Sequence, residues 1–117
     1  MKKIYHLQAC STCQRILDEV GAQKHGAVLQ DIKTDKITAA QLDEMKRLAG
    51  SYEALFSRKA LKFRSMGLHE KQLTEKDYRK LILEEYTFLK RPVAILNGKI
   101  FVGNTKTVVA GLKDALQ

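Results

Sequence analysis

The cysteine pair Cys10-Ser-Thr-Cys13 lies between two segments with different hydrophobic periodicities, and this junction constrains the fold more than any other feature. Residues 2–7 alternate between two faces, with His6 on the inward face, which is typical of a strand. After the cysteines, apolar residues recur at helical spacing up to Gly21, a residue type that commonly ends helices. The sequence therefore predicts that Cys10 lies where a strand turns into a helix.

This position favours a reactive thiol at Cys10. The N–H groups of the first helical turn have no partners within the helix, so they stabilise a thiolate and lower the pKa of the thiol. Cys13 lies three residues later on the same helix face, where its sulfur can reach that of Cys10. The pair suits a dithiol that attacks, becomes oxidised and is then resolved.

Two other interpretations of the cysteines stay open. They could form half of a zinc site, although the chain has no second cysteine pair and the histidines at positions 6, 25 and 69 show no ligand spacing with them. They could also be inert packing residues. In a cytoplasmic protein, two cysteines are more often redox-active or metal-binding than a structural disulfide. Because the chain lacks further ligands at a suitable spacing, we favour redox chemistry and expect no metal site.

The composition indicates one domain covering residues 1–117. The chain lacks the apolar stretch and cleavage site of a signal peptide, and no segment is apolar enough to span a bilayer, so we expect a cytoplasmic protein with no membrane partner. The net charge of +8 is spread along the chain. Three explanations of this positive charge stay open: a solvated surface, local anion capture and nucleic-acid binding. No nucleic-acid-binding motif is present in the sequence, so we expect no direct nucleic-acid contact.

The middle of the chain, residues 34–89, has helical apolar spacing. Cap and stop residues divide it into three expected helices: Thr38 to Gly50, a shorter stretch over residues 53–66 that ends at Gly67, and a helix opened by a capping box of Thr74 and Asp77. The apolar residues expected to form the core of this insert are Leu48, Leu55, Phe56, Leu61, Phe63 and Leu68.

The segments on either side of this insert are expected to form one sheet. Residues 26–32 predict a second, buried strand parallel to the first. After Pro92, the expected elements are strands at 93–96 and 99–102, an Asn97-Gly98 hairpin turn between them, and an amphipathic helix over 105–116. The order β-α-β, insert, β-β-α predicts an α/β, thioredoxin-like fold with a mixed four-stranded sheet. Its core comprises residues 1–33 and 90–117, and residues 34–89 are inserted between strands two and three.

With these elements assembled, the chain resembles the arsenate reductase (ArsC)/Spx family throughout its length. Four separated motifs carry the resemblance in the order in which the family has them: Ile4-Tyr5-His6-x-x-Ala9-Cys10-Ser-Thr, Ser57-Arg58-Lys59 followed by Met66-Gly67-Leu68, Leu89-Lys90-Arg91-Pro92-Val93, and Gly98-Lys-Ile-Phe-Val-Gly103. The combination is specific, although each motif alone is a weak signal.

The resemblance implies roles for five residues. Cys10 corresponds to the catalytic cysteine, and His6 corresponds to a histidine near it. Arg58 and Arg91 correspond to arginines that bind an oxyanion. Pro92 corresponds to a proline that is cis in thioredoxin-like folds.

The chain also departs from the glutaredoxin-coupled arsenate reductases. Those enzymes look to have a third arginine after the last hairpin. In that segment this chain has only Lys106, whose point charge lacks the bidentate fork that suits tetrahedral oxyanions. They also tend to lack a cysteine three residues after the catalytic one, where this chain has Cys13. The resulting Cys-x-x-Cys pattern is similar to that of Spx-type regulators.

Two functions are consistent with this resemblance. In the first, the chain is an oxidoreductase in which Cys10 attacks an arsenate-like oxyanion or an oxidised thiol, and Cys13 or an external thiol resolves the adduct. It needs no bound cofactor and takes electrons from glutathione or from a thioredoxin or glutaredoxin partner. In the second, the chain is a redox-sensing regulator that binds RNA polymerase and is switched by a Cys10–Cys13 disulfide. The two retained arginines, Arg58 and Arg91, favour the enzyme.

Overall fold

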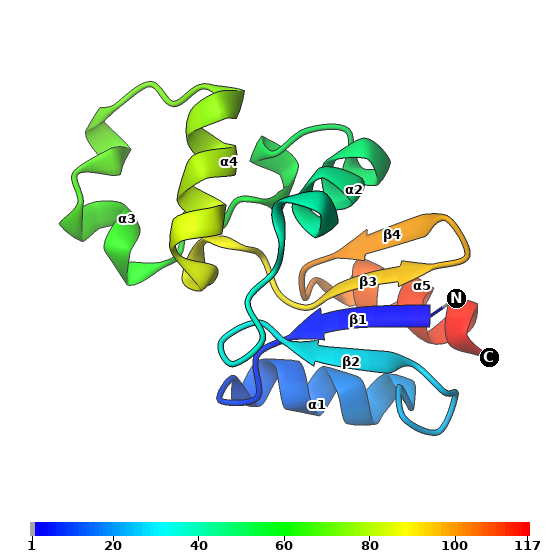
Figure 1. The fold of residues 1–117 in the computed structure, drawn as a ribbon. Helices are drawn as coiled ribbons and strands as arrows, with labels where there is room; N and C mark the ends of the chain where they lie inside the picture. The colour runs from blue at the N-terminus through cyan, green and yellow to red at the C-terminus, as the bar shows by residue number, and fades with distance from the viewer. Residues whose placement is uncertain (1) are drawn as a thin grey trace. The chain divides into compact units, whose positions relative to one another are not determined.

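The computed structural model describes residues 2–117, and these divide into two units (Figure 1). The sheet unit comprises residues 2–36 and 91–117, and the helical unit comprises residues 37–90. None of the described helices is long and apolar enough to cross a membrane.

The sheet unit contains a mixed four-stranded sheet in the order β2-β1-β3-β4. Its strands are β1 (Lys2–His6), β2 (Val28–Asp31), β3 (Val93–Leu96) and β4 (Lys99–Val102). β1 pairs in parallel with β2 and antiparallel with β3, and β3 pairs antiparallel with β4. This topology confirms the α/β, thioredoxin-like arrangement expected from the order of the elements.

The expected second strand is shorter and less buried than its sequence suggests. Only Val28–Asp31 of the expected residues 26–32 form β2, and Gly26 adopts a positive φ of 78° in the preceding turn. The prediction of a buried strand was wrong because β2 lies at the edge of the sheet, where Val28 keeps 54% of its surface exposed. Apolar composition alone does not distinguish an edge strand from a central one.

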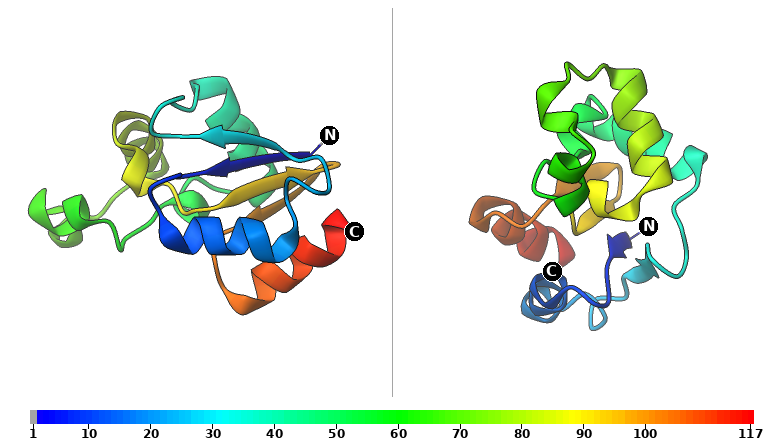
Figure 2. Two further views of the ribbon diagram at one scale, coloured as in Figure 1. Left: turned by 90° about the horizontal axis from the view of Figure 1, so that it is seen from below. Right: turned by 90° about the vertical axis from the view of Figure 1, so that its left-hand side faces the viewer.

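Helices α1 (Ser11–Val20) and α5 (Lys106–Leu116) cover one face of the sheet (Figure 2). The core between helices and sheet consists of Ile4, Ile16, Leu17, Val20, Ala22, Ala94, Leu96, Val109, Leu112 and Leu116. Local signals set the ends of these elements: Gly21 closes α1 in a left-handed conformation, and Thr105 caps α5 by accepting a hydrogen bond from the Val108 N–H. The β3–β4 turn has positive φ at both Asn97 and Gly98, as a two-residue hairpin requires.

The helical unit contains α2 (Ala39–Ala49), η1 (Glu53–Leu55), α3 (Leu61–Ser65), η2 (Leu68–Glu70), α4 (Glu75–Glu84) and η3 (Tyr86–Phe88). Thr38 and Thr74 each open a helix with a reciprocal capping box, which confirms both expected starts. Gly50 ends α2 as predicted.

The prediction of one helical stretch over residues 53–66 was wrong. The chain forms the short turn η1, then extends at Phe56, whose backbone bridges to Leu89, before α3 begins. The Phe56 ring is fully buried and stacks on Phe88, with ring centroids 5.0 Å apart. Burial of this ring and the backbone bridge outweigh the local helical spacing, since tertiary packing commonly overrides helix propensity.

The predicted core of the insert is also correct only in part. Leu55, Phe56 and Leu68 are buried, whereas Leu48 and Phe63 are partly buried. Leu61 is 91% exposed and is the first residue of α3, a helix that has no buried residue.

Candidate active site

Cys10 lies at the junction of β1 and α1 that the sequence predicts. It is the N-cap residue of α1, with an extended backbone (φ −92°, ψ 110°). Its N–H donates to the Leu7 carbonyl at 3.0 Å, and its carbonyl accepts from the Gln14 N–H at 3.1 Å. These two hydrogen bonds hold the Leu7–Cys10 turn against the first turn of the helix, so the thiol is presented at a defined place.

The surroundings of Cys10 favour the thiolate. Burial by itself raises the pKa of this thiol, because it disfavours the charged form. That effect is outweighed by the backbone N–H and the thiol of Cys13, by the positive charge of Arg91 and by the backbone N–H of Thr12, so the pKa lies below its ordinary value. The Cys10 side chain makes no capping hydrogen bond of standard geometry, so the N–H groups act on it mainly as oriented dipoles.

Cys13 is the less acidic thiol of the pair. It lies on α1 with only 1% of its surface exposed, and burial raises its pKa to about 11. The negative charge of Cys10 and the hydrogen bond to it also contribute to this raised value, against the opposing effects of the Leu7 backbone and Arg91. Both cysteines are free, so the pair is reduced in this structure. The hydrogen bond between the two side chains lowers the pKa of Cys10 and raises that of Cys13.

Arg91 lies within electrostatic range of both sulfurs, since its charge lowers the pKa of Cys10 and of Cys13. The sheet register explains this placement: Val93 at the start of β3 pairs with Tyr5 near the end of β1, so the residue before Pro92 lies beside the strand end that leads to Cys10. The Arg91–Pro92 peptide bond is cis, the isomer that the family resemblance implies.

His6 is buried at the end of β1, and its ring nitrogen Nδ1 is hydrogen-bonded to the Gln14 side chain. The Gln14 amide nitrogen lies 3.2 Å from His6 Nδ1 and 3.1 Å from the Leu7 carbonyl. An amide NH2 group can donate to both acceptors, which leaves the imidazole proton on Nε2. Burial lowers the pKa of His6, against the opposing charge of Asp31, so the ring is neutral at pH 7.

Gln14 was not singled out in the sequence, although it joins three parts of the site. Its side chain connects α1 to the end of β1 and to the turn before Cys10. A signal was present in its spacing, because a residue four positions after Cys10 lies on the same helix face. The sequence could not show that this face contacts the buried His6.

The other two predicted anion-binding residues have different surroundings. Arg58 belongs to the helical unit, where its Nη2 donates to Glu53 Oε2 and to the Tyr78 hydroxyl, both at 2.8 Å. The ion pair with Glu53 is the main reason that the pKa of Arg58 is raised. Lys106 is exposed at the first turn of α5 in the sheet unit. Within residues 2–117, no group of three or more His, Cys, Asp or Glu side chains is arranged to hold a metal ion.

Comparison with known proteins places this arrangement in context. Residues 5–111 match the model of the ArsC family. The chain is similar to the structure of an arsenate reductase from Vibrio cholerae, with 18% identity and a TM-score of 0.79 over 95% of this chain and 96% of that chain. It is also similar to an arsenate reductase (ArsC) related protein from Brucella melitensis, with 23% identity and a TM-score of 0.72 over 91% of this chain and 88% of that one.

A third similar structure comes from Streptococcus mutans and is named "a possible arsenate reductase". It shares 25% identity at a TM-score of 0.76, and the match covers 96% of this chain and 97% of that chain. No curated protein matches the chain. The structural likenesses agree with the thioredoxin-like fold derived from the sheet order.

Proposed function

Because this chain belongs to the ArsC family, we propose that it is a thiol-dependent oxidoreductase that reduces an arsenate-like oxyanion with electrons from two thiols. The observation that supports this proposal best is the grouping of two unequal thiols and one guanidinium. Cys10 has a lowered pKa, Cys13 has a raised pKa, and Arg91 acts electrostatically on both. A nucleophile, a second thiol and a cation for the anion are what such a reaction requires.

In the proposed first step, the Cys10 thiolate attacks the pentavalent arsenic of arsenate. A sulfur–arsenic bond forms, and one arsenate oxygen takes up protons and leaves as water. The lowered pKa of Cys10 increases the fraction of thiolate at a given pH, which favours attack without a separate base. The neutral, buried His6 then has a positioning role through Gln14 instead of removing the proton.

In the proposed second step, a thiolate attacks the Cys10 sulfur and a disulfide forms. The sulfur–arsenic bond breaks, its electron pair passes to arsenic, and trivalent arsenite leaves. Cys13 is suited to this role once the adduct has formed, because the Cys10 charge that raises its pKa is then gone. Glutathione could attack in its place, and a thioredoxin or glutaredoxin would then reduce the resulting disulfide.

The positive side chains offset the charge of the anion in this proposal. Arg91 is the first candidate, because it already acts on the reacting sulfur. Arg58 follows from the family resemblance, and it would bind an oxyanion with the part of its guanidinium that Glu53 leaves available. Lys106 would replace the third arginine of the glutaredoxin-coupled enzymes as a point charge.

A coupled assay tests the proposal. NADPH oxidation is followed with arsenate in the presence of either thioredoxin and its reductase or glutathione, glutaredoxin and glutathione reductase. We expect arsenate-dependent turnover that Cys10→Ser abolishes. If Cys13 resolves the adduct, Cys13→Ser should abolish turnover with thioredoxin. If glutathione resolves it, Cys13→Ser should leave the glutaredoxin-coupled rate unchanged. Absence of turnover with both donors would refute the proposed activity.

A second candidate function is a redox switch without turnover. The hydrogen bond between the Cys13 thiol and Cys10 favours it, because two sulfurs in contact can form a disulfide under oxidation. In this function the oxidised and reduced chains would differ in affinity for RNA polymerase. Equal binding of both forms to the polymerase would exclude the switch.

A further inference from the structure

The helical unit exposes apolar side chains around its shortest α-helix. α3 has no buried residue, and its first residue, Leu61, is 91% exposed. Met66, which ends α3, is 47% exposed. Among the described residues, the other large hydrophobic side chain with comparable exposure is Val28, which lies in the sheet unit. A helix that leaves its apolar residues in water is a candidate contact for another molecule.

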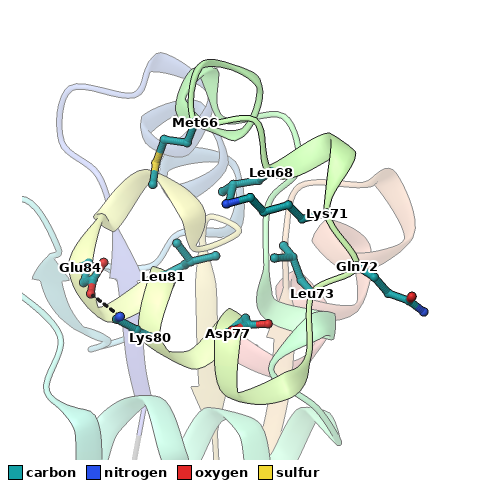
Figure 3. A pocket seen from close by; sticks show the side chains of 9 residues that line it. All are labelled: Met66, Leu68, Lys71, Gln72, Leu73, Asp77, Lys80, Leu81 and Glu84. Carbon is teal, nitrogen blue, oxygen red and sulfur yellow. Dashed lines mark ion pairs between the residues drawn. The ribbon is translucent and has the colours of Figure 1, made fainter.

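A cavity of about 330 Å³ adjoins this helix, and Met66, the residue that follows the helix, lines it (Figure 3). Leu68, Leu73 and Leu81 form the apolar part of its wall, and Met66 points into it from the rim. The Lys71 side chain extends across the opening with its ammonium group toward Leu68. The cavity therefore offers apolar walls beneath a positive charge.

The charge along α3 and the residues that flank it is positive. Residues 57–67 contain four basic residues and no acidic one. Arg58 pairs with Glu53, and Lys62 pairs with Glu85 at 2.7 Å. The remaining cations are Lys59, Arg64 and, at the cavity, Lys71, and none of these three has an ion pair within the part of the chain that the structure describes.

The lining of the cavity itself is balanced in charge, because the carboxylates of Asp77 and Glu84 offset the ammonium groups of Lys71 and Lys80. Asp77 accepts hydrogen bonds from the N–H and hydroxyl of Thr74, and these bonds close the capping box of α4. Glu84 lies 3.9 Å from Lys80, on the next turn of the same helix. The surplus of positive charge on this surface therefore comes from Lys59 and Arg64, and Lys71 places a further cation at the opening of the cavity.

We propose that Leu61, Met66, the cavity and the cations Lys59, Arg64 and Lys71 form a docking surface for an acidic, amphipathic segment of another protein. An apolar side chain of that segment enters the cavity, and its carboxylates contact the three cations. We infer a protein and not a nucleic acid because Leu61 and Met66, the most exposed apolar side chains of this surface, are aliphatic, and aliphatic side chains neither pair with phosphates nor stack on bases. This role is additional to the proposed thiol chemistry and does not depend on it.

The test uses a fluorescein-labelled amphipathic peptide with leucines on one helical face and glutamates on the other. We expect saturable binding in fluorescence anisotropy that weakens with added salt, and no comparable binding of a scrambled peptide or of one with lysine in place of glutamate. Leu61→Ser and the double variant Arg64→Glu/Lys71→Glu should each reduce affinity by about tenfold or more, the size of a contact that matters in an interface.

Two matched variants control for general changes. Val28→Ser removes an exposed apolar residue from the sheet unit, and Arg47→Glu reverses an exposed charge on α2, so neither should change the peptide affinity. Because Leu61 is almost fully exposed, the Leu61→Ser variant should fold normally, which circular dichroism can check. The proposal would be overturned if the scrambled peptide bound as tightly as the amphipathic one, or if the two control variants lost as much peptide affinity as the test variants. Tighter binding of a duplex DNA probe than of the peptide would overturn it in favour of nucleic acid.

Discussion

The contacts of Gln14 lead to a quantitative prediction. Gln14→Met keeps the length and volume of the side chain but removes the amide that donates to His6 Nδ1 at 3.2 Å and to the Leu7 carbonyl at 3.1 Å. A partly buried hydrogen bond contributes about 1 kcal/mol net, so the loss of both should lower the free energy of unfolding by about 2 kcal/mol. For a domain of this size, that corresponds to a fall in Tm of roughly 5–10 °C.

The same variant should change the chemistry of the site. Without the Gln14 donor, the neutral His6 ring is no longer held with its proton on Nε2, and nitrogen NMR shifts should report a mixture of tautomers. The Leu7–Cys10 turn should also loosen, because the Leu7 carbonyl keeps only its bond from Cys10. We therefore expect the pKa of Cys10 to rise and its alkylation by iodoacetamide at pH 7 to slow by about threefold to tenfold.

Gln23→Met is the matched control, since Gln23 is an exposed glutamine in the same unit and should tolerate the change within about 0.5 kcal/mol. A Gln14→Met protein with the stability, His6 tautomer and Cys10 reactivity of the parent would refute this reasoning. A loss of stability alone would show that Gln14 supports the fold without positioning the thiol.

Three further predictions follow from the same structure. Iodoacetamide at neutral pH should label Cys10 before Cys13, because the pKa of Cys10 is lowered while that of Cys13 is about 11. If peptide mapping by mass spectrometry finds Cys13 labelled first, the assignment of nucleophile and resolver is reversed. Arg91→Gln should raise the pKa of Cys10, seen as a shift of the alkylation profile to higher pH, and should weaken arsenate or sulfate binding in calorimetry with little change in Tm; an unchanged profile would place Arg91 outside the site. The free energy of unfolding should fall between about pH 9 and pH 11, because the unfolded chain releases the Cys13 proton near the ordinary thiol pKa of 9.0 while the folded chain retains it to about 11. Denaturant titrations should show a shallower fall with pH for Cys13→Ala than for the parent. Parallel curves for the two proteins would contradict the raised pKa.

Features that depend on neighbouring residues were predictable from the sequence. The strand-to-helix junction at Cys10, the capping box of Thr74 with Asp77 and the Asn97-Gly98 turn all have the predicted form. Each depends on backbone groups within a few residues, so the residue types present there are sufficient to specify the conformation. The order of these elements along the chain then allowed few sheet topologies, and the thioredoxin-like one was correct.

Features that depend on distant partners required the tertiary structure. Phe56 leaves the helical pattern because its ring packs on Phe88 and its backbone meets Leu89, more than thirty residues away. Leu61 is exposed because it lies on α3, a helix that packs no residue into the core, and Val28 is exposed because β2 occupies an edge of the sheet. The sequence alone also determined which thiol begins a helix and is therefore acidic. Only the folded chain placed Gln14 against His6, because that contact depends on how α1 packs beside the end of β1, which the residue types along the sequence do not specify.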